Sequence, residues 1–194
     1  MLPDSETTAS EDQLEPPPLD PAALERRKAA LRQIRRFGDP VLKSRAAEVD
    51  AFNEALGNEI ERMGLLMNDA IGVGLAATQV GTLRRFFVYR VDEEDELRAL
   101  VNPVIEWASD EEESSEEGCL SLPDVHVDVT RPIEVRVTAQ DRFGEELTIE
   151  AVGLEARVIQ HEIDHLDGIL IIDRASRSQR REAMSALREF DGSL

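Results

Sequence analysis

Residues 154–166 read Leu-Glu-Ala-Arg-Val-Ile-Gln-His-Glu-Ile-Asp-His-Leu, and Gly168 follows shortly after. The apolar residues recur at the spacing of one helical face, which predicts a helix that ends at Gly168. His161 and His165 stand four residues apart, so their imidazoles share a face and can bind one metal ion. Glu162 lies beside them and can take up a proton. Taken alone, the pair fits two ordinary, partly buried helix histidines equally well.

A catalytic site of this kind needs a third protein ligand and an open position. The extended protease pattern would place a histidine at position 171, where this chain has Ile171. The single cysteine, Cys119, lies in the stretch Glu-Gly-Cys-Leu-Ser-Leu-Pro at 117–123. A lone cysteine is usually a small buried apolar residue, but the glycine before it and the short turn around it also suit an exposed thiolate.

The rest of the chain predicts an α+β fold, with largely antiparallel sheets packed around a central metal-binding helix and with a C-terminal helix. Residues 53–68 carry apolar side chains on one helical face, with Asp50 as a candidate cap, and residues 175–190 form an Arg-rich amphipathic pattern. β-Branched or alternating segments predict strands at residues 85–91, 97–105, 132–139 and 146–151.

The formal net charge of −19 is concentrated in two segments. Residues 1–25 carry seven acids and no base, and residues 92–117 carry twelve acids and one base, so the remainder is nearly neutral. Broad nucleic-acid binding, DNA included, is disfavoured because it needs clustered positive charge. We expect residues 1–20 to be a disordered acidic tail, residues 21–36 a helical extension and residues 37–194 a single catalytic domain. The acidic run 109–117 is predicted to be a solvated loop.

Composition indicates where the protein works. No window approaches the roughly 18 uninterrupted apolar residues of a membrane span, and the N-terminus lacks the pattern of a secretory signal. One cysteine cannot form an internal disulfide, which favours a reducing compartment. We therefore expect a cytoplasmic protein with no membrane partner.

Three motifs together resemble the signatures of the peptide deformylase family. They are Gly-Val-Gly-Leu-Ala-Ala-Thr-Gln at 72–79, Glu-Gly-Cys-Leu-Ser at 117–121 and His-Glu-Ile-Asp-His at 161–165, in the order and spacing of that family. The resemblance extends from about residue 31 to residue 190. It implies a metal-dependent hydrolase that removes the formyl group from N-formylmethionine of newly made polypeptides and releases formate.

The resemblance also implies roles for individual residues of the motifs. The metal ligands would be Cys119, His161 and His165. Glu162 would be the general acid and base, while Gln79 and the backbone N–H of Leu120 would hold the developing oxyanion. The metal would be Fe²⁺, with Zn²⁺, Ni²⁺ or Co²⁺ able to take its place, because a thiolate and two imidazoles do not select iron.

The same resemblance implies the substrate-binding residues. Gly74 and Gly118 would form backbone hydrogen bonds to the peptide, and the methionine pocket would be lined by Val73, Leu154 and the stem of Arg157. His126 stands where the family often has an arginine that contacts the substrate. Arg157 departs from the aliphatic residue of many members. A guanidinium that points into the pocket would put methionine preference in doubt, whereas one that reaches solvent would leave it intact. His126 is equally well explained as an ordinary exposed histidine. Glu117 is expected to pair with Arg131.

Two alternatives to a deformylase remain at this point. One is a metalloprotease of the His-Glu-x-x-His type, which Ile171 disfavours. The other is a noncatalytic homologue, which the presence of Glu162 disfavours because a structural site has no use for that base. The expected partners are N-formylmethionyl nascent peptides and, through the Arg-rich C-terminal helix, the ribosome. That helix is explained equally well as the solvated face of a packing element.

We predict that deletion of residues 1–20 leaves deformylation turnover intact, because this segment has almost no large apolar residue to pack against the rest of the chain. Formate release from formyl-Met-Ala measures this. A truncated protein that folds but no longer turns over would show that the tail contributes to the site.

Overall fold

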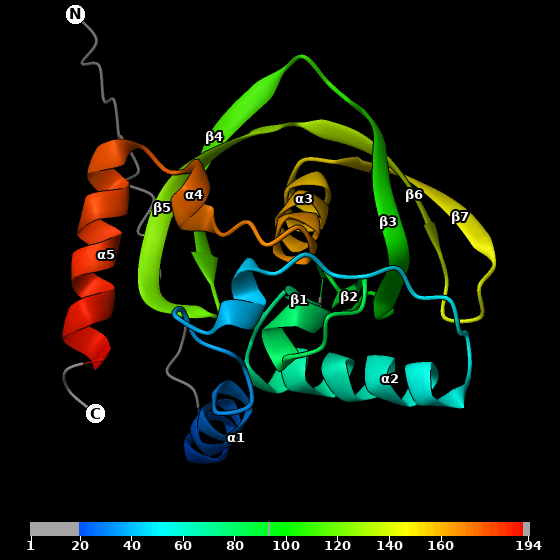
Figure 1. The fold of residues 1–194 in the computed structure, drawn as a ribbon, viewed down its shortest axis with the longest axis horizontal. Helices are drawn as coiled ribbons and strands as arrows, with labels where there is room; N and C mark the ends of the chain where they lie inside the picture. The colour runs from blue at the N-terminus through cyan, green and yellow to red at the C-terminus, as the bar shows by residue number, and fades with distance from the viewer. Residues whose placement is uncertain (1–19, 93, 192–194) are drawn as a thin grey trace, which may run out of the picture.

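The computed structural model describes residues 20–92 and 94–191. Within them the helices are α1 (Pro21–Leu31), α2 (Glu54–Asp69), α3 (Leu154–Leu166), α4 (Ile171–Arg174) and α5 (Arg177–Asp191), with 3-10 turns at Pro40–Lys43 and Ala77–Val80 (Figure 1). The strands are β1 (Gly74–Ala76), β2 (Phe86–Tyr89), β3 (Arg98–Ala108), β4 (Glu112–Cys119), β5 (Leu122–Pro132), β6 (Glu134–Gln140) and β7 (Glu146–Val152). The tail predicted for residues 1–20 lies outside the described residues except for Asp20, which caps α1.

α3 lies at the centre of the molecule, with strands around it (Figure 1). One sheet has the order β1-β2-β3-β6-β7, the hairpin β4-β5 forms the second, and every pairing in both is antiparallel. The predicted α+β class, with antiparallel sheets around a central helix and a C-terminal helix, is confirmed.

β2 separates two apolar cores because successive side chains of a strand point to opposite faces. Phe86 and Val88 pack in the cluster with α2, and Phe87 and Tyr89 pack in the cluster with α3. All four are buried. The sheet is therefore covered on one face by α2 and on the other by α3.

α3 begins and ends where the sequence predicts, and it is buried nearly all round. Apolar residues such as Ile159 and Leu166 fill the core, yet Glu162, Asp164 and His165 are buried as well. Buried polar groups need partners or a function, because their desolvation is costly. This helix therefore carries the polar centre of the fold.

α2 has the predicted apolar face but a different cap. Asp50 was the expected cap, whereas the Asn53 side chain accepts a hydrogen bond from Leu56 N at 3.1 Å. A cap bonds the second or third residue inside the helix, and α2 begins at Glu54, so only Asn53 is in place.

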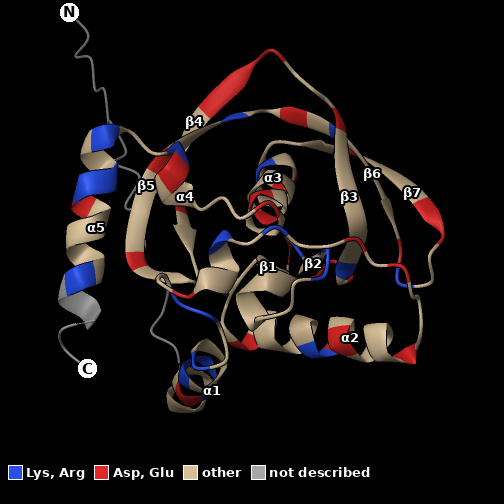
Figure 2. Cartoon of the chain, viewed as in Figure 1, with Lys and Arg blue, Asp and Glu red and all other residues tan. Residues whose placement is uncertain are grey.

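The prediction of a solvated loop at residues 109–117 is wrong in its conformation. Most of this run belongs to β4, which pairs with β5 in a register that sets Glu113 opposite Arg131. Ladder hydrogen bonds come from the backbone, so the acidic side chains of residues 112–116 stay exposed while the strand forms. Figure 2 shows the acidic colour along β4. Its partner β5, which buries alternate side chains, was not predicted.

The N-terminal helix is shorter than predicted, whereas the predicted C-terminal helix is confirmed. The helix expected up to residue 36 ends at Leu31, and the backbone N–H groups of Arg35 and Phe37 donate instead to Gln79 O at 2.7 Å and Ser121 O at 2.9 Å. The C-terminal helix is present as α5, which packs on β5 through Ala183 and Leu187. No described helix is both long enough and apolar enough to span a membrane.

We predict that Met63→Ala lowers the free energy of unfolding by about 2–5 kcal/mol, because Met63 is 0% exposed in the α2 core and its truncation leaves a cavity. Leu65, two residues away and 68% exposed, supplies the control, and Leu65→Ala should change stability by no more than about 0.5 kcal/mol. Urea unfolding measures both. Equal losses would contradict the assignment of the buried face of α2.

Candidate metal centre

Cys119, His161 and His165 meet between the β4-β5 hairpin and α3. Their candidate ligand atoms all lie within 4.8 Å of one another, and Cys119 Sγ is 3.2 Å from His165 Nε2. The two imidazoles are edge to face, with ring centroids 5.0 Å apart. The helix supplies two donors from one face, and the end of β4 supplies the third. The three residues predicted as ligands are thus brought together.

This donor set fits a divalent metal ion. Thiolate and imidazole ligands suit zinc, iron and neighbouring metals, and three protein ligands leave a position open for chemistry. Burial lowers the pKa of His165 well below its usual value, which keeps the imidazole in the neutral form that binds metal. Burial also disfavours charge on His161, but its hydrogen bonds with Cys119 and Glu117 outweigh burial and raise its pKa to about 10. A metal ion that binds His161 therefore displaces a proton.

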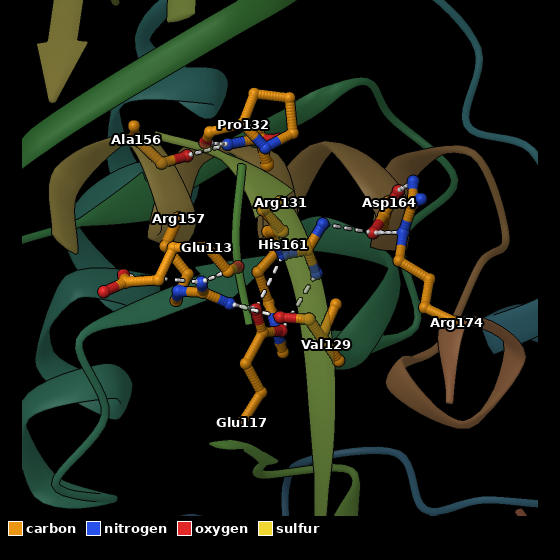
Figure 3. Close-up of polar contacts among 11 residues, drawn as sticks. Glu113, Glu117, Val129, Arg131, Pro132, Ala156, Arg157, His161, Asp164 and Arg174 are labelled. Atoms are coloured by element: carbon orange, nitrogen blue, oxygen red, sulfur yellow. Dashed lines mark hydrogen bonds and ion pairs between the residues drawn. The ribbon is translucent and has the colours of Figure 1, made fainter. Parts of the chain in front are cut away.

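Glu117 orients His161 from the side away from this cluster. Its Oε2 lies 3.0 Å from His161 Nδ1, which leaves Nε2 free to face the cluster. Arg131 donates from Nε to Glu117 Oε1 at 2.7 Å and from Nη2 to Oε2 at 2.9 Å (Figure 3). Burial raises the pKa of Glu117, but the hydrogen bonds from Arg131 and His161 outweigh it and hold that pKa well below its usual range. The predicted pair of Glu117 with Arg131 is present.

The same network continues to Asp164 and Arg174, which sequence reasoning missed. Arg131 Nη1 donates to Asp164 Oδ2 at 2.8 Å, and Arg174 donates to both oxygens of Asp164 (Figure 3). Asp164 is 6% exposed, so its charge needs these partners. Its position in the sequence could have indicated this role, because Asp164 is a carboxylate next to His165 on a helix whose other residues are mostly apolar or candidate ligands.

The guanidinium of Arg157 is held by hydrogen bonds to the β4-β5 hairpin. Its Nη1 donates to Glu117 Oε1 at 2.8 Å and to Val129 O at 2.9 Å, and its Nη2 donates to Glu113 O at 2.8 Å (Figure 3). The side chain is 12% exposed. The sequence considered a guanidinium in the methionine pocket or one in solvent, and it did not anticipate these hydrogen bonds to the hairpin.

Glu162 lies buried next to the cluster. Burial raises the pKa of Glu162 to about 7, so the carboxyl group can both accept and release a proton near neutral pH. Its Oε2 has no hydrogen-bond partner among the described residues. A Cβ added at Gly74 would overlap Glu162 Oε1, which explains the glycine at this position of β1.

Gln79 has its amide orientation set by its own turn. Its Oε1 accepts from Ala76 N at 2.9 Å, so Nε2 points toward the hairpin, 3.1 Å from Ser121 Oγ and 3.7 Å from Cys119 Sγ. Leu120 lies in the two-residue turn between β4 and β5, directly after Cys119. Gln79 therefore contacts the thiol, and Leu120 is next to Cys119 in the chain.

Most of the expected substrate-binding residues are exposed, whereas Gly74 is buried in the edge strand β1 and Arg157 is largely buried on α3. Val73, Leu154 and His126 are exposed. Gly118 stands opposite His126 in the β4-β5 register, and a Cβ there would come within 3.0 Å of the imidazole. Their contacts with a peptide remain predictions.

Comparisons with known proteins agree with this arrangement. The family model for polypeptide deformylase matches residues 31–181. Peptide deformylase 1 of Corynebacterium glutamicum is 49% identical over 161 residues, which cover 82% of this chain and 95% of the relative. The crystal structure of peptide deformylase from Thermotoga maritima matches with a TM-score of 0.71 at 49% identity, covering 74% of this chain and 96% of that one. An Arabidopsis thaliana deformylase structure matches with a TM-score of 0.78 at 34% identity, covering 83% of this chain and 91% of that one. The chain belongs to the polypeptide deformylase family.

Proposed function

We propose that the protein hydrolyses the N-terminal formyl group of newly made polypeptides that begin with N-formylmethionine, and releases formate. The observation that carries the proposal is the convergence of Cys119, His161 and His165, with ligand atoms within 4.8 Å, beside the buried Glu162. Family membership supports it independently. Because nascent polypeptides are the substrate, the proposed place of action is the cytoplasm.

The proposed cofactor is one divalent metal ion held by Cys119, His161 and His165. Such an ion supplies Lewis acidity, which activates water and polarises the formyl carbonyl. Fe²⁺ is the proposed metal, with Zn²⁺, Ni²⁺ or Co²⁺ as substitutes that the same ligands accept.

The proton is proposed to move through Glu162. Its carboxylate takes the proton from the attacking water and then gives it to the departing amine, so one residue serves as base and then as acid. A pKa of about 7, raised by burial, supports both halves of this role. Gly74 brings the backbone of β1 against Glu162, which limits the positions the carboxyl group can take.

Charge that develops on the formyl oxygen is proposed to be held by Gln79 Nε2 and the backbone N–H of Leu120. The bond from Ala76 N to Gln79 Oε1 supports this role, because it fixes the amide so that its N–H groups face the hairpin. Donors that are oriented before the reaction stabilise the transition state without further reorganisation.

The peptide is proposed to bind as an extended strand between β1 and β4. β1 is an edge strand of its sheet, and β4 pairs with β5 alone among the described strands, so both offer backbone groups to an added strand. Gly74 and Gly118 would donate or accept those bonds. Val73, Leu154 and the stem of Arg157 would form the methionine pocket, and His126 would contact the peptide backbone.

Docking of α5 on the ribosome is a further part of the proposal, and some of the C-terminal arginines already pair with acids. Arg174 pairs with Asp164, and Arg180 lies 3.5 Å from Asp173. Three other arginines are exposed on α5 and are proposed to contact the ribosome: Arg177, Arg181 and Arg188.

We predict that the anaerobically purified protein releases formate from formyl-Met-Ala and that Glu162→Ala abolishes this activity while metal content is retained, because the ligands are unchanged. Glu150→Ala, which removes an exposed carboxylate on β7, is the control and should turn over normally. Activity that survives Glu162→Ala, or an inactive wild-type protein with full metal occupancy, would overturn the deformylase proposal.

We also predict that Cys119→Ser lowers iron content after purification, because a hydroxyl is a much weaker ligand than a thiolate for such metals. Elemental analysis of the wild-type protein and the variant, prepared side by side, measures the change. Unchanged metal content would exclude Cys119 as a ligand.

A further inference from the structure

Arg157 joins three parts of the site region with one buried guanidinium. The side chain comes from α3, and its donors reach the Glu117 carboxylate and Glu113 O on β4 and Val129 O on β5, all within 2.9 Å (Figure 3). A planar guanidinium suits several acceptors held in fixed directions, which a lysine ammonium does not match. The residue is therefore placed to hold the hairpin against the helix.

Arg157 and His161 act on the same carboxylate from one face of α3. They lie four residues apart, so one is a single helical turn below the other. Arg157 donates to Glu117 Oε1 at 2.8 Å, and His161 Nδ1 lies 3.0 Å from Oε2. Arg131 bonds both oxygens as well. With two partners on each oxygen, the carboxylate cannot rotate without breaking hydrogen bonds.

The hairpin is tied to α3 on both sides of His161. Asp164, three residues after His161, receives Arg131 of β5 at 2.8 Å. Arg157, four residues before His161, holds β4 and β5 by the bonds described above. Without Arg157, the hairpin would keep its bonds to Gln160, His161 and Asp164, which all follow Arg157 on α3, and could pivot about them. Cys119 ends β4, so such a pivot would move it relative to the two histidines.

We propose that Arg157 is a positioning residue of the metal centre: it fixes Glu117 against His161 and sets the hairpin that carries Cys119 at ligand distance from α3. The proposal rests on the proposed function, because it assumes that these three residues bind metal. The guanidinium of Arg157 carries this role by its hydrogen bonds, and the role is compatible with a methionine pocket lined by the aliphatic stem.

The test measures metal affinity in the absence of substrate. Metal-free wild-type protein, Arg157→Leu and Arg157→Lys are titrated with Zn²⁺ against a fluorescent chelator. Loss of a group that orients a ligand typically costs about 10–100-fold in metal affinity, and we expect a loss in this range for Arg157→Leu and a smaller one for Arg157→Lys. The matched control is Arg136→Leu, which removes an exposed arginine that pairs with Glu150 on the surface and should bind Zn²⁺ within about twofold of wild type.

Urea unfolding and steady-state kinetics separate positioning from two simpler roles. A purely stabilising arginine would lower the free energy of unfolding and leave Zn²⁺ affinity in the folded protein unchanged. A pocket residue would change KM for formyl-Met-Ala and the preference for methionine, with unchanged Zn²⁺ affinity. Either result overturns the proposal. If Arg157→Leu does not fold, Arg157→Lys decides by the same measurements. A wild-type protein that binds no Zn²⁺ would instead overturn the proposed metal site itself.

Discussion

A carboxylate buried against an arginine sets the geometry on which the metal centre depends. Glu117 and Arg131 are 6% and 2% exposed. The free energy needed to remove both charges from water is far larger than the stabilisation that a surface ion pair contributes. The cost is offset because both oxygens of Glu117 are fully bonded and Arg131 also reaches Asp164. Since Glu117 and Arg131 belong to the hairpin and Asp164 to α3, this network decides where Cys119 meets His161.

Close approach of backbone and side chains explains two glycines of the motif at residues 72–79. A Cβ at Gly72 would come within 2.8 Å of Leu120, and one at Gly74 would overlap Glu162. These contacts join the segment before β1 to the turn after β4 and to α3. At these glycines, three distant parts of the chain are in contact. The need for close contact therefore links motifs that are about 40 residues apart in the sequence.

Sequence reasoning succeeded where the signal was local and failed where it depended on a partner across the fold. α3 was predictable because its spacing and Gly168 lie within one stretch. β4 was not, because exposed acidic side chains conceal a backbone ladder that only β5 completes. The bonds of Arg157 were equally hidden, since a cation on a helix does not specify which carboxylate it will meet. The Asn53 cap was missed for a smaller reason: Asn53 was taken as the first residue of the helix, whereas the helix begins one residue later, at Glu54.

A count of charges along the chain does not distinguish groups that face solvent from groups that form the site. The structure does distinguish them. The acids of residues 112–116 are exposed, whereas Glu117, at the end of the same run, is buried and paired. The C-terminal arginines divide by partner and not by burial, because Arg174 pairs with the buried Asp164 although its own side chain is 40% exposed, while Arg177 is exposed on α5. Solvent and salt screen the exposed members, but the buried ones interact strongly over short distances. The acids of residues 112–116 therefore face solvent, and the few buried pairs determine how the site is built.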